Sequence, residues 1–329
     1  MNKQAFQYAV IVVSFMSILY GITYQQYGFF NLNDPRGSQD AVSYIQMSHN
    51  NYDVSSVHRY RFVIPVLAKY VRTSLTHFIN SDDQDVLSFY IVNYIFTLIS
   101  SLIFLALLKS LGFDSWLSIA GVVIFMCSRI TILTTGTPLI DSFFYMSVLL
   151  ILFLTVTDRG TLLALSMPFL CLSKETILPF LFFPLLTHLR RSPGYLASLV
   201  VSIGVFISSR YVIDGRFTHS NSSFLSVINE HIEACAHNAA ELFSLKGMHD
   251  LQNGFSLFLV LGLLGFYINY KHRLFTIPVF FHLIVPMSLF FALLSGNSGR
   301  MFFISFPVII PYVLILFLHL RREFYSQDE

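Results

Sequence analysis

The sequence contains few charged residues. Of its 329 residues, 12% are charged and 55% are hydrophobic, and phenylalanine alone accounts for 35 positions. A soluble globular domain carries about 25% charged residues. This shortage excludes an ordinary soluble domain, and the formal net charge of +2 provides no basic field for nucleic acid. We therefore expect an integral membrane protein that contacts membrane lipids and no nucleic acid.

Cysteine is also scarce. The three cysteines, Cys127, Cys171 and Cys235, are far apart in the sequence. There is no CxxC motif and no Cys/His cluster with zinc spacing, so the sequence predicts neither a disulfide framework nor a metal site. Internal repeats and low-complexity linkers are lacking as well. We expect one polytopic membrane domain over residues 1–329.

Long hydrophobic runs, in contrast, are frequent. A helix needs about 20 apolar residues to cross the hydrocarbon layer, and fewer when it is buried in a bundle. The first run lacks a small-x-small cleavage site, which favours an uncleaved helix over a signal peptide. The sequence predicts an all-α integral membrane protein with about ten transmembrane helices, at residues 7–24, 87–109, 114–132, 139–157, 161–173, 176–189, 195–212, 255–270, 274–295 and 301–320.

The distribution of lysine and arginine predicts the orientation of these helices. With an inner N-terminus, every short inner segment carries at least one basic residue, whereas the opposite side has far longer loops and most of the acidic residues. Basic residues are enriched in inner loops, which predicts that both termini lie inside and that residues 25–86 and 213–254 form outer loops. The inner basic residues are then Lys3, Lys109, Arg159, Arg190, Arg191, Lys271, Arg273, Arg321 and Arg322.

Both outer loops contain a helical pattern. In residues 62–79, Lys69 and Arg72 would be costly at the bilayer centre, so an amphipathic helix at the membrane interface explains this segment better than a span. Its apolar positions recur at helical spacing: Ile64, Leu67, Val71, Leu75 and Phe78. In the second loop, the segment SVINEHIEACAHNAAELFSL predicts another helix on the membrane surface.

An acidic residue begins the helical part of the first outer loop. Ser38 is a suitable N-cap, which places Asp40 in the first turn and Tyr44 on the same helix face. Two interpretations stay open. Asp40 complements the helix dipole, or it is a general base in an outward-facing cleft. Asp34 is the competing base, although Asp34-Pro35-Arg36-Gly37 is also typical of an ordinary turn.

Basic residues stand near the predicted outer ends of apolar segments. Arg59 and Arg61 precede the amphipathic helix, where they either face lipid headgroups or hold a phosphate with their bidentate guanidinium groups. Lys174 and Glu175 separate two short apolar runs. They form either a paired loop tip or, through the lysine, a phosphate site in a low dielectric.

Two further charged residues begin predicted spans. Arg300 precedes the last helix, and Asp141 begins the fourth, where it could form a structural ion pair with a basic residue. Ionisable groups at membrane depth are costly and mark a functional site or a paired network.

Four segments in this order resemble the GT-C superfamily of polytopic glycosyltransferases, which take a sugar from a polyprenyl-phosphate donor on the outer membrane face. The resemblance extends loosely over most of the chain. It is carried by HRYRFVIPVLA (58–68), TGTPLIDSFFYMSVLLILFL (135–154), LSKETILPFLFFPLL (172–186) and GRMFFISFPVIIPYV (299–313).

The resemblance implies a GT-C-like fold and an inverting transfer of a hexose or pentose. The donor is a polyprenyl-phosphate-linked sugar, the acceptor is a hydroxyl of a glycan or lipid, and the site faces the periplasm from the bacterial inner membrane. In this family the acid of the first outer loop activates the acceptor, which implies that Asp40, or alternatively Asp34, is the base. The implied donor-phosphate ligands are Lys174, Arg300, Arg59 and Arg61, supported by Glu175, Asp141 and Tyr44.

The sequence departs from the family pattern in two respects. No adjacent acidic pair occurs in the first half of the first outer loop, since Asp82-Asp83 comes only after the amphipathic segment. The large soluble C-terminal domain of many members is not found. We therefore assign no cofactor, although the resemblance leaves a divalent metal open. The alternatives are a flippase for lipid-linked glycans, an O-antigen polymerase or ligase, a membrane acyltransferase using His282, and a non-catalytic assembly subunit.

Overall fold

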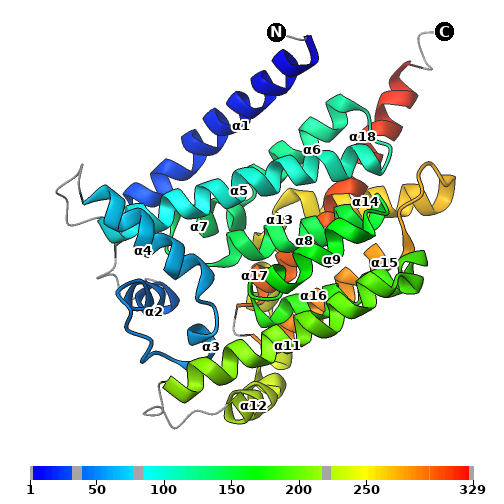
Figure 1. Ribbon diagram of the computed structural model, residues 1–329. Helices are drawn as coiled ribbons and strands as arrows, with labels where there is room; N and C mark the ends of the chain where they lie inside the picture. The colour runs from blue at the N-terminus through cyan, green and yellow to red at the C-terminus, as the bar shows by residue number, and fades with distance from the viewer. Residues whose placement is uncertain (1–2, 32–38, 77–83, 217–223, 296, 326–329) are drawn as a thin grey trace. The chain divides into compact units, whose positions relative to one another are not determined.

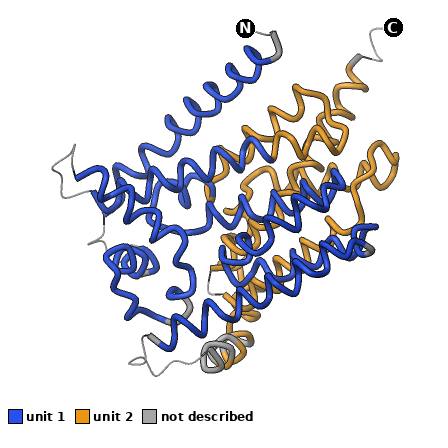
Figure 2. Tube along the Cα trace, viewed as in Figure 1, with its two compact units in different colours: residues 1–103, 131–227 blue, residues 104–130, 228–329 orange. Residues whose placement is uncertain are grey.

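The computed structural model describes residues 3–31, 39–76, 84–216, 224–295 and 297–325, and within these ranges every regular element is helical (Figure 1). The all-α prediction is confirmed for this part of the chain. The helices fall into two compact units, each built from two separate segments (Figure 2). The first unit comprises residues 1–103 and 131–227, and the second comprises residues 104–130 and 228–329.

Helix length and composition support between four and six membrane spans in the described residues. Two additional spans arise if helices bent by 59° and 81° each count as one broken span: α6 (Ser115–Cys127) with α7 (Arg129–Gly136), and α13 (Leu245–Phe255) with α14 (Leu257–His272). The predicted count of about ten transmembrane helices remains a prediction. The four long helices are α1 (Lys3–Gly28), α5 (Gln84–Ser110), α11 (Pro193–Arg216) and the stretch Ser298–Phe324.

The long helices expose apolar side chains that a water-soluble protein would bury. Val13 of α1 is 60% exposed, and Val200 and Ile207 of α11 are 70% and 60% exposed. Large exposed apolar surfaces mark membrane or protein contacts. Together with the length of these helices, this exposure supports a membrane protein.

The first unit is built around α8 (Asp141–Val156), which is buried along almost its whole length. Helix α9 (Gly160–Leu170) packs against α8 and α11. The hydroxyl of Ser198 on α11 donates a hydrogen bond to the carbonyl of Ala164 on α9. The short helices α2 (Gln39–Ser48), α3 (Ser56–Arg59) and α4 (Val63–Leu75) complete the N-terminal segment of this unit.

Helix α4 occupies the segment for which we predicted an amphipathic helix. It packs against α2 and buries Ile64 and Ala68, whereas Leu67 is 37% exposed. The existence of the helix is confirmed. The exposed Leu67 leaves the predicted contact of this helix with the membrane interface a prediction. The helix predicted in the second outer loop corresponds to α12 (Phe224–Leu242).

A polar network fixes the start of α8 to α5. The Asn93 side-chain amide donates to the carbonyls of Thr137 and Leu139 at 3.0 and 2.9 Å, and its oxygen accepts a hydrogen bond from the Ser142 hydroxyl at 2.5 Å. Buried backbone carbonyls need such partners where a helix has not yet begun. The network therefore fixes the position of Asp141.

Prolines prevent a regular helix after α9. Lys174 is extended, and the chain then forms only short turns because Pro179 and Pro184 cannot continue a hydrogen-bonded helix. This break presents Lys174 to the interior of the first unit, whereas the side chain of Glu175 beside it is 37% exposed. The turns are η1 (Glu175–Ile177), α10 (Leu178–Leu181), η2 (Phe183–Leu186) and η3 (His188–Arg191).

In the second unit, α14 packs closely along α18 (Phe306–Tyr325). Gly262 and Gly265 make this approach possible, since a Cβ at Gly262 would lie 2.9 Å from the side chain of Ile309 and a Cβ at Gly265 would overlap the carbonyl of Tyr312. The unit also contains most of α12, together with α15 (Val279–His282), α16 (Ile284–Leu293), α17 (Ser298–Phe302) and η4 (Phe303–Ser305).

Candidate functional site

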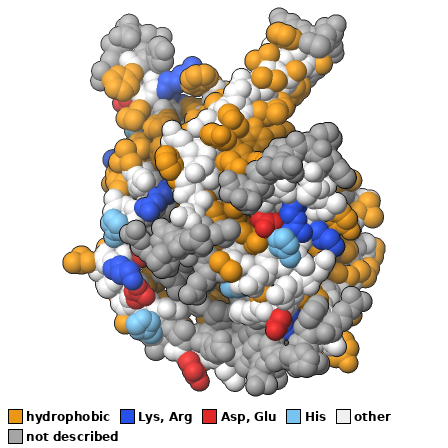
Figure 3. Space-filling model, turned by 90° about the vertical axis from the view of Figure 1, so that its left-hand side faces the viewer, with side chains coloured by type: hydrophobic (Ala, Val, Ile, Leu, Met, Phe, Trp, Pro, Cys, Tyr) orange, Lys and Arg blue, Asp and Glu red, His pale blue; other side chains and the backbone are white. Residues whose placement is uncertain are grey.

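Charged side chains from five parts of the first unit meet in one group, which we name the charged cluster. They come from α2, the α3–α4 junction, the start of α8, the break after α9 and the end of α11. Figure 3 shows acidic, basic and histidine side chains at the surface on the side where α2 and α4 lie in Figure 1. The cluster consists of Asp40, Tyr44, His58, Arg59, Tyr60, Arg61, Asp141, Lys174, Glu175, Arg210 and Asp214.

Asp40 in the first turn of α2 contacts His58. The His58 Nε2 lies 3.1 Å from the Asp40 Oδ1, and the two side chains are 16% and 27% exposed. The two groups are therefore within ion-pair distance. The His58 ring is set edge-on to Tyr44 at 5.3 Å, and its Nδ1 is buried with no hydrogen-bond partner in the described part of the chain. Asp40 is thus oriented and partly accessible, as a general base requires.

Arg61 connects α2 with the break after α9. Its guanidinium is bidentate on Glu175, with Nε 3.1 Å from Oε2, and its Nη1 donates to the Tyr44 hydroxyl at 3.2 Å. Burial would raise the pKa of Glu175, but the Arg61 charge and its hydrogen bonds outweigh burial and lower this pKa to about 2. Burial raises the pKa of Tyr44 to about 12 against the opposing charge of Arg61. The Tyr44 hydroxyl therefore stays protonated at neutral pH.

Lys174 and Asp141 form the most deeply buried ion pair of the cluster. The Lys174 Nζ lies 3.2 Å from the Asp141 Oδ1, and the side chains are 2% and 3% exposed. The ammonium group also lies 5.8 Å from the ring centre of Phe144. A charge this far from solvent requires a counter-charge. Asp141, expected as a supporting residue, provides it.

Arg59 and Tyr60 hold the end of α11. The Arg59 Nη2 donates to the Val54 carbonyl at 2.8 Å, and Nη1 lies 3.5 Å from the Asp214 carboxylate. The Tyr60 hydroxyl donates to the same carboxylate at 2.6 Å. Burial and the neighbouring Asp214 both raise the pKa of Tyr60. Arg59 is only 1% exposed, so these contacts anchor the segment before α4 to α11.

Arg210 differs from the other three basic residues of the cluster. Its guanidinium lies 3.3 Å from the ring centre of Phe206 and 5.1 Å from that of Tyr60, and its Nη1 donates to the Phe206 carbonyl at 3.1 Å. It is 7% exposed and forms no ion pair among the described residues. Since stacking on aromatic rings leaves an arginine positively charged, Arg210 retains the capacity to bind an anion.

An apolar groove of about 500 Å³ is lined by residues that neighbour Arg61 and Arg210 in the chain, although no residue of the charged cluster is among its lining residues. Its wall includes Ser208, Ser209 and Val212, which flank Arg210 on α11, and Phe62, which follows Arg61. The remaining wall residues are Tyr52, Val205 and Ile213. The lining of the groove suits an apolar chain.

The predicted site residues divide between the two units. Asp40 and Lys174 belong to the charged cluster, as do Tyr44, Arg59, Arg61, Asp141 and Glu175. Arg300 belongs to the second unit, where it is 9% exposed and the Asn297 side chain accepts from its backbone N–H at the start of α17. Asp34 lies outside the described residues. The structure thus brings seven of the nine predicted residues into one group.

Sequence reasoning did not assign His58, Arg210 or Asp214 to the site. His58 stands beside Arg59 in the printed sequence, but nothing local indicates its contact with Asp40, which is 18 positions away in the chain. Arg210 and Asp214 are four residues apart at the end of an apolar helix, and this spacing puts them on one helix face. These two charged residues on one helix face could have predicted that the end of α11 contributes to the cluster.

The charged cluster contains as many carboxylates as cations. Asp40, Asp141, Glu175 and Asp214 face Arg59, Arg61, Lys174 and Arg210, with His58 in addition. In the described ranges, no three His, Cys, Asp or Glu side chains are placed to hold a metal ion. The arrangement offers a carboxylate for proton transfer and cations for an anionic group. Comparison of the chain with models of protein families, with characterised proteins and with solved structures gave no match.

Proposed function

We propose that this protein is a membrane glycosyltransferase of the GT-C type. It transfers a sugar from a polyprenyl-phosphate donor to an acceptor hydroxyl on the outer face of a bacterial inner membrane. The observation that carries the proposal is the apolar groove beside the charged cluster. A polyprenyl-phosphate sugar combines a long apolar tail, an anionic phosphate and a polar sugar, and these parts match the groove, Arg210 and the Asp40 region.

Asp40 acts as the general base in this proposal. The acceptor hydroxyl gives its proton to the Asp40 carboxylate while its oxygen forms a bond to the anomeric carbon of the donor sugar. The bond from that carbon to the phosphate oxygen breaks, its electron pair leaves with the polyprenyl phosphate, and the anomeric configuration inverts. His58 orients the carboxylate, and its buried Nδ1 has no hydrogen-bond partner in the described residues.

Arg210 is the first contact for the donor phosphate, because it forms no ion pair with a carboxylate among the described residues. A fixed cation in a site with little water stabilises the negative charge that develops on the leaving phosphate. Lys174, Arg59 and Arg61 each contact a carboxylate. Their proposed roles as phosphate ligands require them to exchange or share these partners when the donor binds. Arg300 remains a further proposed ligand.

In the proposed topology both termini lie inside and the chain crosses the membrane about ten times. The four long helices account for four of these spans, and the two bent helix pairs bring the number to six. This topology places the α2–α4 region outside, where lipid-linked donors are consumed in GT-C enzymes. It also keeps the tail of the donor in the bilayer during transfer, which is the physical reason for a site built on membrane helices.

Donor consumption by the full chain in proteoliposomes tests the proposal. A panel of polyprenyl-phosphate hexoses and pentoses is supplied together with glycan and lipid acceptors, and release of polyprenyl phosphate is followed by mass spectrometry. We expect one or more donors to be consumed. Val212→Trp, which fills the groove, raises KM for the donor, whereas Val200→Trp on the lipid-exposed part of the same helix leaves KM unchanged.

Two results would count against the proposal. Release of no polyprenyl phosphate from any donor contradicts glycosyl transfer. Movement of an intact donor across the bilayer without cleavage identifies a transporter of lipid-linked sugars instead.

A further inference from the structure

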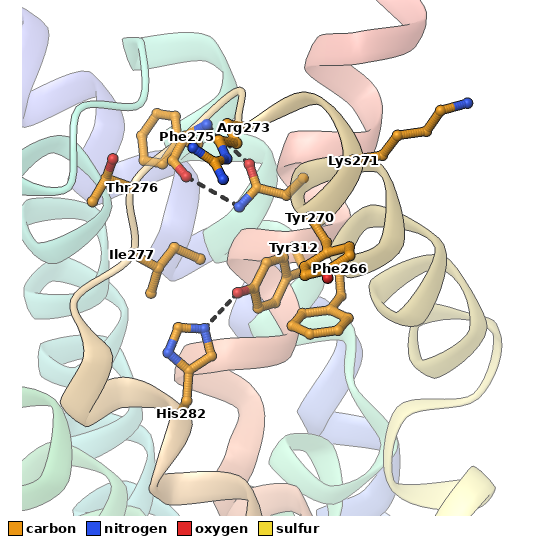
Figure 4. A pocket seen from close by; sticks show the side chains of 10 residues that line it. Phe266, Tyr270, Lys271, Arg273, Phe275, Thr276, Ile277, His282 and Tyr312 are labelled. Carbon is orange, nitrogen blue, oxygen red and sulfur yellow. Dashed lines mark hydrogen bonds between the residues drawn. The ribbon is translucent and has the colours of Figure 1, made fainter.

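The second unit contains an open cavity of about 620 Å³ between α14, the loop after it, α15 and α18 (Figure 4). The Tyr312 ring lies edge-on to Phe266 at 5.2 Å, and its hydroxyl is hydrogen-bonded to the His282 Nε2 at 2.6 Å. Figure 4 shows this pair at one side of the cavity and Arg273 at the other. Cavities of 300–1,000 Å³ are the usual size for small-molecule sites.

The loop that carries Arg273 is fixed by hydrogen bonds. The Asn269 side-chain amide donates to the Phe275 carbonyl at 3.0 Å, and its oxygen accepts from the Phe275 N–H at 2.9 Å. Phe275 stacks on Phe113 at 4.3 Å within the same unit. Arg273 has a left-handed backbone with φ of 49° at the end of α14. The backbone at Arg273 is therefore held by structure on both sides of it in the chain.

The charged residues that line the cavity are all basic. Two of its ten lining residues, Lys271 and Arg273, are basic and none is acidic. Neither cation forms an ion pair within the described residues, and Lys271 points away from the cavity in Figure 4. His272 of the same turn stacks on His319 at 5.4 Å. The negative end of the α14 helix dipole offsets part of this charge, and the basic side chain of Arg273 is the group of the wall that can contact an anion.

The position of the cavity indicates that such an anion belongs to the membrane–water interface. It lies at the end of an apolar helix whose Tyr267 and Tyr270 are 61% and 79% exposed. Exposed tyrosines followed by basic residues are typical of the membrane–water interface, and basic pockets between membrane helices bind anionic headgroups.

We propose that this cavity binds a phosphate-bearing anion, most directly the headgroup of an anionic phospholipid. Arg273 donates hydrogen bonds to the phosphate oxygens, the Tyr312–His282 pair contacts the polar remainder of the headgroup, and Phe266 lies along its glycerol and acyl region. This site is separate from the charged cluster and does not depend on glycosyl transfer.

The test measures binding to the full-length chain purified in detergent and stripped of lipid. The probes are phosphatidylglycerol and phosphatidylcholine in mixed micelles, and free sn-glycerol 3-phosphate. Thermal unfolding reports ligation, because a ligand that binds the folded state raises Tm. The variant Arg273→Asn removes the charge and tolerates the left-handed backbone. The control Arg190→Asn removes an exposed basic residue elsewhere.

We expect phosphatidylglycerol to raise Tm more than phosphatidylcholine, and Arg273→Asn to weaken its Kd by about tenfold or more, as the loss of a charge-assisted hydrogen bond does. Arg190→Asn should bind as the unmodified chain does. An equal, Arg273-dependent effect of glycerol 3-phosphate supports the phosphate site and identifies a free phosphate as a sufficient ligand. The proposal is overturned if neither anion raises Tm, or if both variants respond alike.

Discussion

At the scale of single residues, the charged cluster consists mostly of pairs. Lys174 with Asp141 and Arg61 with Glu175 each join two parts of the chain that are distant in sequence. Removing one member of a buried pair leaves a charge without compensation, which costs far more than the pair contributes in total. The cations of the cluster therefore have a structural role whether or not they also bind a phosphate.

The Lys174–Asp141 pair gives the first prediction. We expect Lys174→Met alone to destabilise the protein by about 3–5 kcal/mol, because it leaves Asp141 buried without its counter-charge. The double variant Lys174→Met/Asp141→Leu should recover most of this loss, as measured by Tm in detergent. Effects of the two single substitutions that simply add would contradict a coupled pair.

The exposed Lys246–Glu241 pair of the second unit is the control, since its lysine is 74% exposed. Its single variants should leave Tm nearly unchanged. Donor consumption by the Lys174→Met/Asp141→Leu protein then shows whether Lys174 has a further role. A folded double variant that retains the normal KM for the donor would exclude Lys174 as a phosphate ligand.

Glu175 gives a prediction on pH dependence. The pKa of Glu175 is lowered to about 2 from 4.5, so its pairing with Arg61 stabilises the folded state fully above pH 4.5 and is lost as the pH falls toward 2. Glu175→Gln should lower Tm at pH 7, and this difference from the unmodified protein should shrink between pH 4.5 and 2. Glu233→Gln, at an exposed position of α12, should change Tm little at any pH. A difference that grows on acidification would contradict the pairing.

The sequence indicated which charges are unusual, but it could not pair them. Arg59, Arg61 and Lys174 attract attention because they stand beside apolar runs, and such positions are costly without partners. Their partners are determined by packing: Arg61 lies 114 residues from Glu175, and Tyr60 lies 154 residues from Asp214. Contacts over such separations require the three-dimensional fold, which local spacing does not contain.

At the scale of elements, hydrophobic runs predicted the helices well and their interruptions less well. Each predicted apolar run coincides with one or more observed helices, because apolar length is a local property. The 59° bend between α6 and α7 and the face of α4 that packs on α2 cannot be predicted from the length of an apolar run. Pro179 and Pro184, in contrast, indicate locally that no regular helix follows α9.

The contact between α14 and α18 gives a prediction at this scale. Gly265→Leu places a side chain against the Tyr312 carbonyl and should lower Tm by forcing the two helices apart. Gly204→Leu is the matched control, because no atom lies within 4 Å of a Cβ added at Gly204 of α11. We expect Gly204→Leu to leave Tm unchanged or to raise it, since glycine disfavours a helix interior. Equal loss in both variants would contradict the close contact.

At the scale of the whole molecule, the proposed sidedness rests on the distribution of basic residues. We expect a single cysteine at position 40, in a chain whose Cys127, Cys171 and Cys235 are replaced by serine, to react with an impermeant thiol reagent in intact cells. A cysteine at position 190 should react only after the membrane is opened, because Arg190 belongs to a predicted inner segment. The reverse pattern would invert the proposed topology and move the charged cluster to the inner face.

The central claim is that Asp40 takes the proton from the acceptor hydroxyl during sugar transfer from a lipid-linked donor, and turnover by Asp40→Asn tests it most directly. The matched control is Asp53→Asn, an exposed carboxylate of the same loop. In proteoliposomes supplied with the donor and acceptor, we predict that Asp40→Asn lowers kcat by about 10²–10⁴-fold, the usual contribution of a general base, with Tm near that of the unmodified protein. Asp53→Asn should retain full turnover. A folded Asp40→Asn protein that releases polyprenyl phosphate at the normal rate would contradict the account.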